Sequence, residues 1–177
     1  MQFKRYDLAI INRGFWPESQ IIGEGLLRLS EKHSESGEKV VIITQSDSGL
    51  MDALIRENRA KNVVVSLCKA RSNSASKVIM RVFDSVIFMC WVFFTLLKKK
   101  PKKVYISTDP PVVVPFIVFI YAKLFKASYV YHLQDIHPEA ASIIIKVNPV
   151  IYRITKWMDS LVMKQASALI TITDTMK

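Results

Sequence analysis

Cysteine is scarce in this chain of 177 residues, which contains only Cys68 and Cys90. Two cysteines make neither a disulfide framework nor a cysteine-rich metal site, and this usage fits a reducing compartment. The N-terminus also lacks the long apolar core of a signal peptide, so we do not expect export. Half of the residues are apolar, which is enough for one well-packed domain over residues 1–177 rather than two.

Glycine-rich phosphate-binding motifs are absent as well. Gly23 and Gly25 begin a dinucleotide fingerprint, but Arg28 occupies the position of the third glycine. The pair also lies about ten residues beyond the first expected strand, too far for that motif. No Gly-x-x-x-x-Gly-Lys-Ser/Thr loop occurs. These absences argue against NAD, FAD and P-loop NTPase chemistry, and we expect no bound cofactor.

Acidic residues are nearly missing from residues 69–103, where Asp84 is the one acid among nine basic residues. That segment carries +8 of the net charge of +10. A local basic patch attracts polyanions, which are either nucleic acid or anionic lipid. The basic residues of this segment are Lys69, Arg71, Lys77, Arg81, Lys98, Lys99, Lys100, Lys102 and Lys103.

Residues 86–94 are nine consecutive apolar residues, shortly before the lysines at 98–100. RNA-binding surfaces interleave aromatic and polar groups, whereas a solid apolar block beside lysines is typical of a bilayer contact. A core helix is one alternative, and a transmembrane span is another. Arg81 and Asp84 argue against the span, which needs about 20 predominantly apolar residues. We favour a helix in the interface of an anionic inner membrane, with no nucleic acid bound. Its contact residues would be Arg81, Trp91, Phe93, Phe94, Lys98, Lys99 and Lys100.

Short aliphatic runs alternate with helical segments along the chain. The runs are too continuous for a sheet with one solvated face, so the pattern predicts a parallel sheet with helices on both faces. Right-handed crossovers then give a doubly wound, Rossmann-like α/β domain with strand order 3-2-1-4-5-6. Strands are expected at residues 6–12, 39–45, 62–67, 103–107, 128–133 and 168–173, and helices at 23–36, 51–59, within 72–101, at 111–125 and at 148–165.

Titratable residues are dense just after the fifth expected strand. His132, Asp135, His137 and Glu139 lie within eight residues, and Pro138 can open a helix. Loops beyond the carboxyl ends of strands are where α/β sheets bind ligands. His132 alternates with apolar neighbours and is expected to pack, whereas Asp135 lies beyond the strand and is the catalytic candidate. Glu139 fits a substrate contact or a first-turn acid favoured by a helix dipole. The group has no recognised metal-ligand spacing, so we expect no metal site.

Two further loops are expected at the same edge of the sheet. The loop at residues 13–22 leads into a helix whose N-terminus can hold an anionic group, with an ordinary surface turn as the alternative. Asp109 ends the fourth expected strand, and the two prolines after it mark either a helix start or a substrate contact by Asp109. The candidate substrate-binding residues are Trp16, Pro17, Glu18, Ser19, Gln20, Gly23, Asp109, His137 and Glu139.

Taken together, these segments resemble the N-terminal, acceptor-side domain of bacterial GT-B glycosyltransferases of family 4, which build O-antigen, capsule and exopolysaccharide. The resemblance covers essentially the whole chain. It rests on the first strand, Phe-Trp-Pro-Glu at 15–18, Ser-Gly-Glu-Lys-Val-Val-Ile-Ile-Thr at 36–44, Ser-Thr-Asp-Pro-Pro at 107–111, His-Leu-Gln-Asp-Ile-His-Pro-Glu at 132–139 and Leu-Ile-Thr-Ile-Thr-Asp-Thr-Met at 169–176.

The resemblance implies transfer of a sugar, with retention, from a nucleotide donor to a lipid-linked acceptor such as a polyprenyl diphosphate saccharide. It implies that no metal is required and that the protein is cytoplasmic, on the inner face of the plasma membrane. Asp135 would orient the acceptor hydroxyl or stabilise positive charge on the sugar ring. The loop at 17–23 would approach the donor diphosphate and acceptor, although Ser-Gln-Ile-Ile at 19–22 replaces the glycine pair of many relatives.

The family's nucleotide-binding lobe and its paired glutamates do not occur in this sequence. We therefore expect the chain alone to be inactive and to need a missing or separate C-terminal GT-B domain. An alternative from another class is a non-enzymatic, membrane-associated adaptor that recruits a separate catalytic subunit. A third interpretation, nucleic-acid binding through the basic segment, predicts a steep dependence of affinity on salt.

Overall fold

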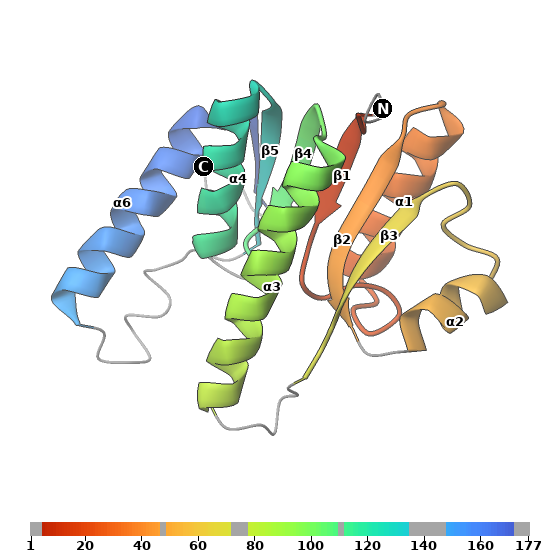
Figure 1. Ribbon diagram of the computed structural model, residues 1–177, viewed down its shortest axis with the longest axis horizontal. Helices are drawn as coiled ribbons and strands as arrows, with labels where there is room; N and C mark the ends of the chain where they lie inside the picture. Colours follow the sequence, from red (N-terminus) through yellow and green to blue (C-terminus); the bar gives the residue numbers. More distant parts are fainter. Residues whose placement is uncertain (1–4, 47–48, 72–77, 110–111, 135–147, 172–177) are drawn as a thin grey trace.

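The computed structural model describes residues 5–46, 49–71, 78–109, 112–134 and 148–171. Strands and helices alternate through these residues (Figure 1). The strands are β1 (Leu8–Ile11), β2 (Val40–Ser46), β3 (Val64–Lys69), β4 (Lys103–Ser107), β5 (Ser128–Leu133) and β6 (Ala168–Thr171). The helices are α1 (Ile22–Glu35), α2 (Gly49–Arg56), α3 (Val78–Lys99), α4 (Val113–Phe125) and α6 (Pro149–Gln165).

The six strands form one parallel sheet in the order β3-β2-β1-β4-β5-β6. The doubly wound α/β order predicted from the sequence is therefore confirmed. In the register of the sheet, Ile10 of β1 lies beside Ile42 of β2 on one side and Tyr105 of β4 on the other. Because all strands run the same way, the loops that follow β1, β2, β4 and β5 meet at one edge.

Helices cover both faces of the sheet. Figure 1 looks onto the layer of α3, α4 and α6, with α1 behind the sheet. Successive residues of β1 alternate between the two cores, as the two-residue period of a strand requires. Ala9 and Ile11 belong to the core under α3 and α4, whereas Leu8 and Ile10 belong to the core under α1 and α2. Both faces of the central strands are therefore apolar, which explains their unbroken aliphatic runs.

Several element ends follow from local chemistry. Gly37, just beyond α1, has a φ of 84°, which suits glycine at the end of a helix. Asn148 caps α6, since its side chain accepts a hydrogen bond from the N–H of Val150 at 2.9 Å. Both ends agree with the sequence prediction. The third strand begins later than expected, because Asn58, Ala60 and Asn62 have positive φ and turn the chain before it.

The long helix α3 packs along the sheet. Its segment Ile79–Lys99 is long and apolar enough to cross a membrane by length and composition, and 28% of it is buried. Phe88, Val92 and Leu96 on its inner side are completely buried in the core under the helix layer. The interpretation of a core helix is therefore confirmed for the inner side of α3. The outer side is exposed, which leaves the interfacial interpretation as a prediction.

Candidate functional site

Polar side chains follow the aliphatic strands at the carboxyl edge of the sheet. Asn12 after β1 and Ser107 at the end of β4 are both buried. The Ser107 hydroxyl donates a hydrogen bond to the side-chain oxygen of Asn12, whose amide donates to the carbonyl of Gly14. Thr44 of β2 donates to the carbonyl of Arg13 at 3.0 Å. The loop after β1 is thus held from both neighbouring strands. The sequence analysis missed these residues, although each is a polar residue near the end of an aliphatic run.

Asp109 lies at the same edge of the sheet as the loop that follows β1, as predicted, and it contacts that loop. Its carboxylate oxygen Oδ2 accepts a hydrogen bond from the N–H of Gly14 at 3.0 Å. Its backbone carbonyl accepts another from the N–H of Arg13, also at 3.0 Å. The structure therefore accounts for Asp109 as a residue that positions the loop. A direct contact between Asp109 and substrate stays a prediction.

Arg13 joins the sheet edge to helix α3 through a small polar cluster. Its Nε donates to Gln45 Oε1 at 2.8 Å, and Gln45 Nε2 donates to Asp84 Oδ1 at 2.9 Å. Arg13 Nη2 lies 3.6 Å from Asp84 Oδ2, and Nη1 donates to the hydroxyl of Ser85 at 2.9 Å. Only 1% of Asp84 is exposed, so its charge is balanced inside the protein. Asp84 is a lone acid in an apolar helix, and this feature of the sequence could have indicated the cluster.

The exposed part of the loop after β1 contains four of the predicted substrate contacts. Pro17, Glu18 and Gln20 are exposed, and Ser19 is partly exposed. Glu18 accepts a hydrogen bond from the hydroxyl of Ser46, at the end of β2, at 2.8 Å. The N–H of Ser19 closes a turn of the loop. The loop is thus ordered by a turn of its own and by a bond from β2, and the side chains of Pro17 and Gln20 are exposed to a ligand.

Gly23 and Trp16 pack against each other at the start of α1. A Cβ added at Gly23 would lie 2.3 Å from the backbone nitrogen of Trp16 and 2.7 Å from the carbonyl carbon of Phe15. Close packing of two backbone segments therefore explains the glycine. The Trp16–Pro17 peptide bond is cis. Gly23 is buried, and its Cα faces the protein. Phosphate binding near Gly23 stays a prediction.

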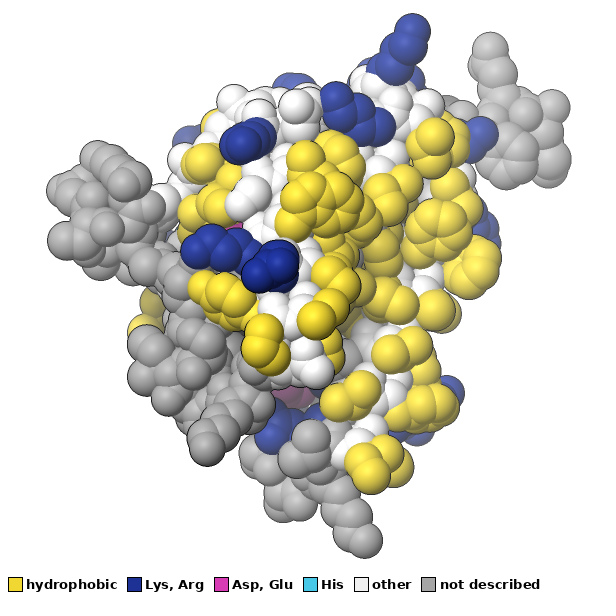
Figure 2. Space-filling view, turned by 90° about the vertical axis from the view of Figure 1, so that its left-hand side faces the viewer, with side chains coloured by type: hydrophobic (Ala, Val, Ile, Leu, Met, Phe, Trp, Pro, Cys, Tyr) yellow, Lys and Arg dark blue, Asp and Glu magenta, His cyan; other side chains and the backbone are white. Residues whose placement is uncertain are grey.

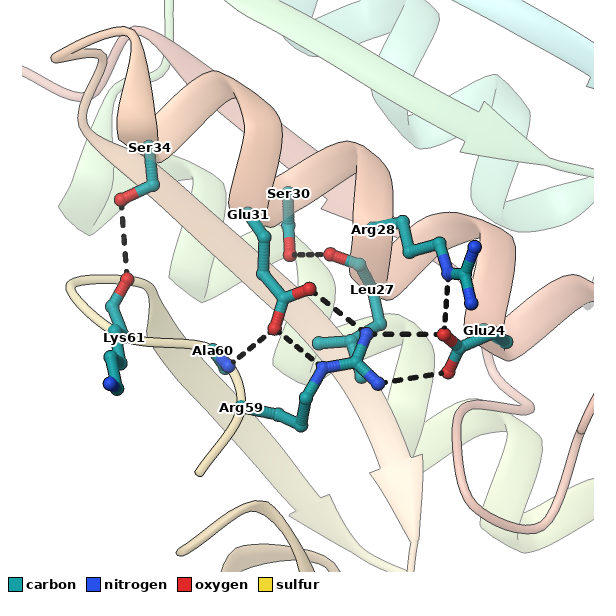
Figure 3. Close-up of polar contacts among 9 residues, drawn as sticks. All are labelled: Glu24, Leu27, Arg28, Ser30, Glu31, Ser34, Arg59, Ala60 and Lys61. Atoms are coloured by element: carbon teal, nitrogen blue, oxygen red, sulfur yellow. Dashed lines mark hydrogen bonds and ion pairs between the residues drawn. The ribbon is translucent and has the colours of Figure 1, made fainter. Parts of the chain in front are cut away.

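Arg59, in the turn after α2, is hydrogen-bonded to two glutamates of helix α1 (Figure 3). Its Nε and Nη2 donate to the two carboxylate oxygens of Glu31 at 2.9 Å, and Nη2 also donates to Glu24 at 3.2 Å. The guanidinium carbon lies 6.0 Å from the centroid of the Trp16 ring. Hydrogen bonds from arginine side chains lower the pKa of both glutamates, with Arg28 and Arg59 acting on Glu24. The sequence analysis did not predict this network.

His132 of β5 is a packed residue, as predicted. The hydroxyl of Tyr105 on β4 and Nδ1 of His132 are hydrogen-bonded at 2.9 Å. Burial lowers the pKa of His132. The next-but-one residue, Gln134, donates its N–H to the hydroxyl of Thr108 at 3.1 Å. Among the residues that the structure describes, the buried side-chain nitrogen Nε2 of Gln134 has no hydrogen-bond partner, an arrangement that needs an explanation.

The remaining candidates of this group, Asp135, His137 and Glu139, lie outside the described residues. Their predicted roles in catalysis and substrate binding therefore stay predictions. Within the part of the chain that the structure describes, no group of three or more His, Cys, Asp or Glu side chains could hold a metal ion.

The predicted membrane residues lie on α3, except Lys100, which directly follows it, and they have different settings. Phe93 and Phe94 are exposed and meet edge to face. Trp91 is anchored to β3, because its indole N–H donates to the hydroxyl of Ser66 at 3.1 Å. Lys99 turns toward Tyr6, with its ammonium group 3.2 Å from the hydroxyl and 4.9 Å from the ring centroid. Lys99 is therefore partly buried, in contrast to the exposed residues Arg81, Lys98 and Lys100.

The lysines at the end of α3 lie far from the loop after β1. Ser85, near the start of α3, contacts Arg13, which follows β1. The carbonyl of Lys99, at the end of α3, accepts from the N–H of Tyr6, which precedes β1. Helix α3 therefore runs antiparallel to the strands. The lysines lie at the amino edge of the sheet, whereas the candidate site lies at the carboxyl edge.

Comparisons with known proteins identify the fold. No family model and no curated protein matches the sequence. MurG of Acinetobacter baumannii matches with a TM-score of 0.53 and 10% identity, over 95% of this chain and 42% of that chain. UGT89C1 of Arabidopsis thaliana, complexed with UDP, matches with a TM-score of 0.53 and 11% identity, over 95% of this chain and 45% of that chain. The chain thus has a Rossmann-like domain of the GT-B type and spans less than half of either structure.

Proposed function

We propose that this chain is the acceptor-side half of a retaining glycosyltransferase of family 4. The enzyme would move a sugar from a nucleotide donor to a lipid-linked saccharide in bacterial surface polysaccharide synthesis. The observation that carries the proposal is the polar edge formed after β1, β2 and β4, in a fold shared with GT-B structures. Ligands of open α/β sheets bind at such an edge. The UDP bound to UGT89C1 supports a nucleotide as part of the donor.

The acceptor would lie between the loop after β1 and the end of β5. Pro17, Glu18 and Gln20 offer exposed side chains on the first of these. On the second, Gln134 Nε2 is a buried donor with no partner among the described residues, and an acceptor hydroxyl would satisfy it. Asp135 is the next residue, and we assign it to orient that hydroxyl or to stabilise positive charge on the sugar ring.

A second lobe would supply the nucleotide site. This chain covers 42% and 45% of the two structures that it matches, so the remainder of a GT-B enzyme has no counterpart in it. We propose that a C-terminal GT-B domain, in the same polypeptide or a separate one, closes over the carboxyl edge. The chain alone would then bind acceptor without transferring sugar, with the nucleotide sugar as co-substrate.

Reconstitution tests this proposal. The chain is combined with candidate second lobes, and nucleotide sugars are screened against polyprenyl diphosphate-linked acceptors. We expect transfer only when both halves are present. In the active pair, Asp135→Ala should lower kcat by about a hundredfold or more if Asp135 contacts the transition state. The matched control is Glu57→Ala, an exposed residue beyond α2, which should leave kcat unchanged.

Two outcomes would contradict parts of the proposal. Near-normal turnover of the Asp135→Ala variant would remove Asp135 from the site. If no donor supports transfer while the chain still recruits a second subunit to membranes, the non-enzymatic adaptor is the better description.

A further inference from the structure

The layer of α3, α4 and α6 presents no exposed acidic side chain of its own. Helix α4 contacts both α3 and α6, so the three form one surface, which we call the helical face. The acids in these helices are Asp84 and Asp159, which are 1% and 5% exposed. Asp84 is bound by Gln45, and Asp159 accepts a hydrogen bond from the hydroxyl of Tyr131 at 2.9 Å. The basic residues of the helices are Arg81, Lys98, Lys99, Lys123, Arg153, Lys156 and Lys164.

The opposite side of the sheet carries charges of both signs. Helix α1 carries Glu24, Glu31 and Glu35 together with Arg28 and Lys32, and α2 carries Asp52 and Arg56. Two of these acids are paired with Arg59. The helices of the helical face therefore carry a net positive charge, which attracts an anionic surface.

Large apolar side chains are exposed among these basic residues. Ile79 and Phe94 of α3 are 81% and 66% exposed, and Trp157 of α6 is 58% exposed. Phe83, Leu124 and Ile154 add to this apolar surface. Figure 2, which faces the α6 side of the molecule, shows hydrophobic side chains spread widely with Lys and Arg between them. Monomeric proteins rarely expose so much apolar surface without a binding function.

We propose that the helical face lies on an anionic lipid bilayer, with α3 and α6 at the level of the headgroups. Anionic headgroups attract each nearby Lys or Arg, and exposed apolar side chains enter the acyl boundary. The exposed indoles of Trp91 and Trp157 suit that depth, where one end of the ring is apolar and the other is wet. Phe116 of α4 contacts Trp157, with ring centroids 6.2 Å apart, so the surface continues between helices.

The proposed orientation determines how a lipid-linked acceptor would reach the candidate site, an inference that rests on the proposed function. Helix α3 runs antiparallel to the strands along the sheet, so a bilayer against α3 lies parallel to the strands. The carboxyl edge with Asp109 then opens sideways along the membrane. A lipid-linked acceptor would reach that edge from the bilayer surface.

Tryptophan fluorescence tests the contact directly. The chain has three tryptophans. Trp91 and Trp157 lie on the helical face, whereas Trp16 packs with the core on the other side of the sheet. Three variants each keep one tryptophan and replace the other two by Phe. On vesicles of phosphatidylglycerol with brominated acyl chains, we expect quenching of Trp91 and Trp157 but not of Trp16. A vesicle-bound chain in which Trp157 is not quenched overturns the proposal.

Charge substitutions test whether α6 contributes to binding of the bilayer. Arg153→Gln with Lys156→Gln on α6, and Lys98→Gln with Lys100→Gln at the C-terminal end of α3, should each lower partitioning onto phosphatidylglycerol vesicles about 10- to 30-fold. The matched control is Lys32→Gln with Lys61→Gln, two exposed lysines on the α1 side, which should partition as the unmodified chain does. Equal partitioning of the α6 pair and the control would overturn the three-helix surface.

Two other results would also overturn the proposal. Tighter binding to duplex DNA than to vesicles, with a steep salt dependence, would assign the helical face to nucleic acid. A dimer that Trp157→Ser dissociates would assign it to self-association. All of these measurements concern binding rather than turnover. They therefore fail or succeed independently of the proposed transferase activity, which is measured separately as sugar transfer by the reconstituted halves.

Discussion

The carboxylate of Asp109 accepts a hydrogen bond from the backbone N–H of Gly14 at 3.0 Å. This bond joins the end of β4 to the loop after β1, two segments that are 95 residues apart in the sequence. The loop contains the exposed side chains that we propose as acceptor contacts. Asp109 therefore determines where those side chains lie, with or without a substrate contact of its own.

Substitution of Asp109 separates the positioning role from a charge effect. Asp109→Ala removes the acceptor of the Gly14 N–H and should lower the free energy of unfolding by about 1–3 kcal/mol. Asp109→Asn keeps a side-chain oxygen at that place and should cost less than about 1 kcal/mol. Urea unfolding measures both. Equal stability of the Ala variant and the unmodified chain would show that the bond does not hold the loop.

Two glycines of α1 make a matched pair for testing the packing at Trp16. Gly23→Ala puts a Cβ within 2.3 Å of the Trp16 backbone and should destabilise the protein by roughly 2–4 kcal/mol. At Gly25 a Cβ would meet nothing within 4 Å, so Gly25→Ala should stabilise by about 0.5–1 kcal/mol. Thermal unfolding compares the two. A Gly23→Ala variant as stable as Gly25→Ala would contradict the close approach.

Arg59 is expected to contribute to stability in a pH-dependent way. Arg59→Met leaves Glu24 and Glu31 without that guanidinium and should lower the free energy of unfolding by about 1–3 kcal/mol near neutral pH. Because the folded state lowers the pKa of both carboxyls, their contribution is present above their ordinary pKa of about 4.3. It is lost as pH falls through the lower folded values.

Urea unfolding at several pH values checks this expectation. The difference between the unmodified chain and Arg59→Met should shrink as the solution is acidified. The control is Arg56→Met, which removes an exposed pair with Glu57 and should cost at most about 0.5 kcal/mol. A difference that stays constant down to acid pH would rule out the two glutamates as its source.

His132 is expected to make the free energy of unfolding depend on pH in a higher range than Glu24 and Glu31 do. Burial lowers its pKa below the ordinary value of about 6.5. The unfolded chain therefore takes up a proton at a higher pH than the folded chain. The contribution to stability is present above about pH 6.5 and is lost as pH falls through the lower folded pKa. We expect His132→Gln to lose less stability than the unmodified chain between about pH 7.5 and pH 5, as measured by urea unfolding. An identical loss in both would show that His132 is not responsible.

Local patterns were sufficient for the fold but not for most of the site. The aliphatic strands and the helix signals at Gly37 and Asn148 predicted the elements, and the crossover rule predicted the strand order. The sequence also placed Asp109 at the same edge of the sheet as the loop after β1. It did not predict the cluster of Arg13, Gln45 and Asp84, because those residues meet only across two strands and a helix.

By itself, the sequence determined a parallel α/β sheet, a long apolar helix and a basic segment after it, since periodicity and composition are local properties. Only the tertiary structure decided how these features share a surface. It turned Lys99 toward Tyr6 and put the lysines at the edge opposite Asp109. It also brought α3, α4 and α6 into one face with their acids, Asp84 and Asp159, buried. Such placements depend on strand register and helix packing between residues far apart in the chain, and no local pattern encodes them.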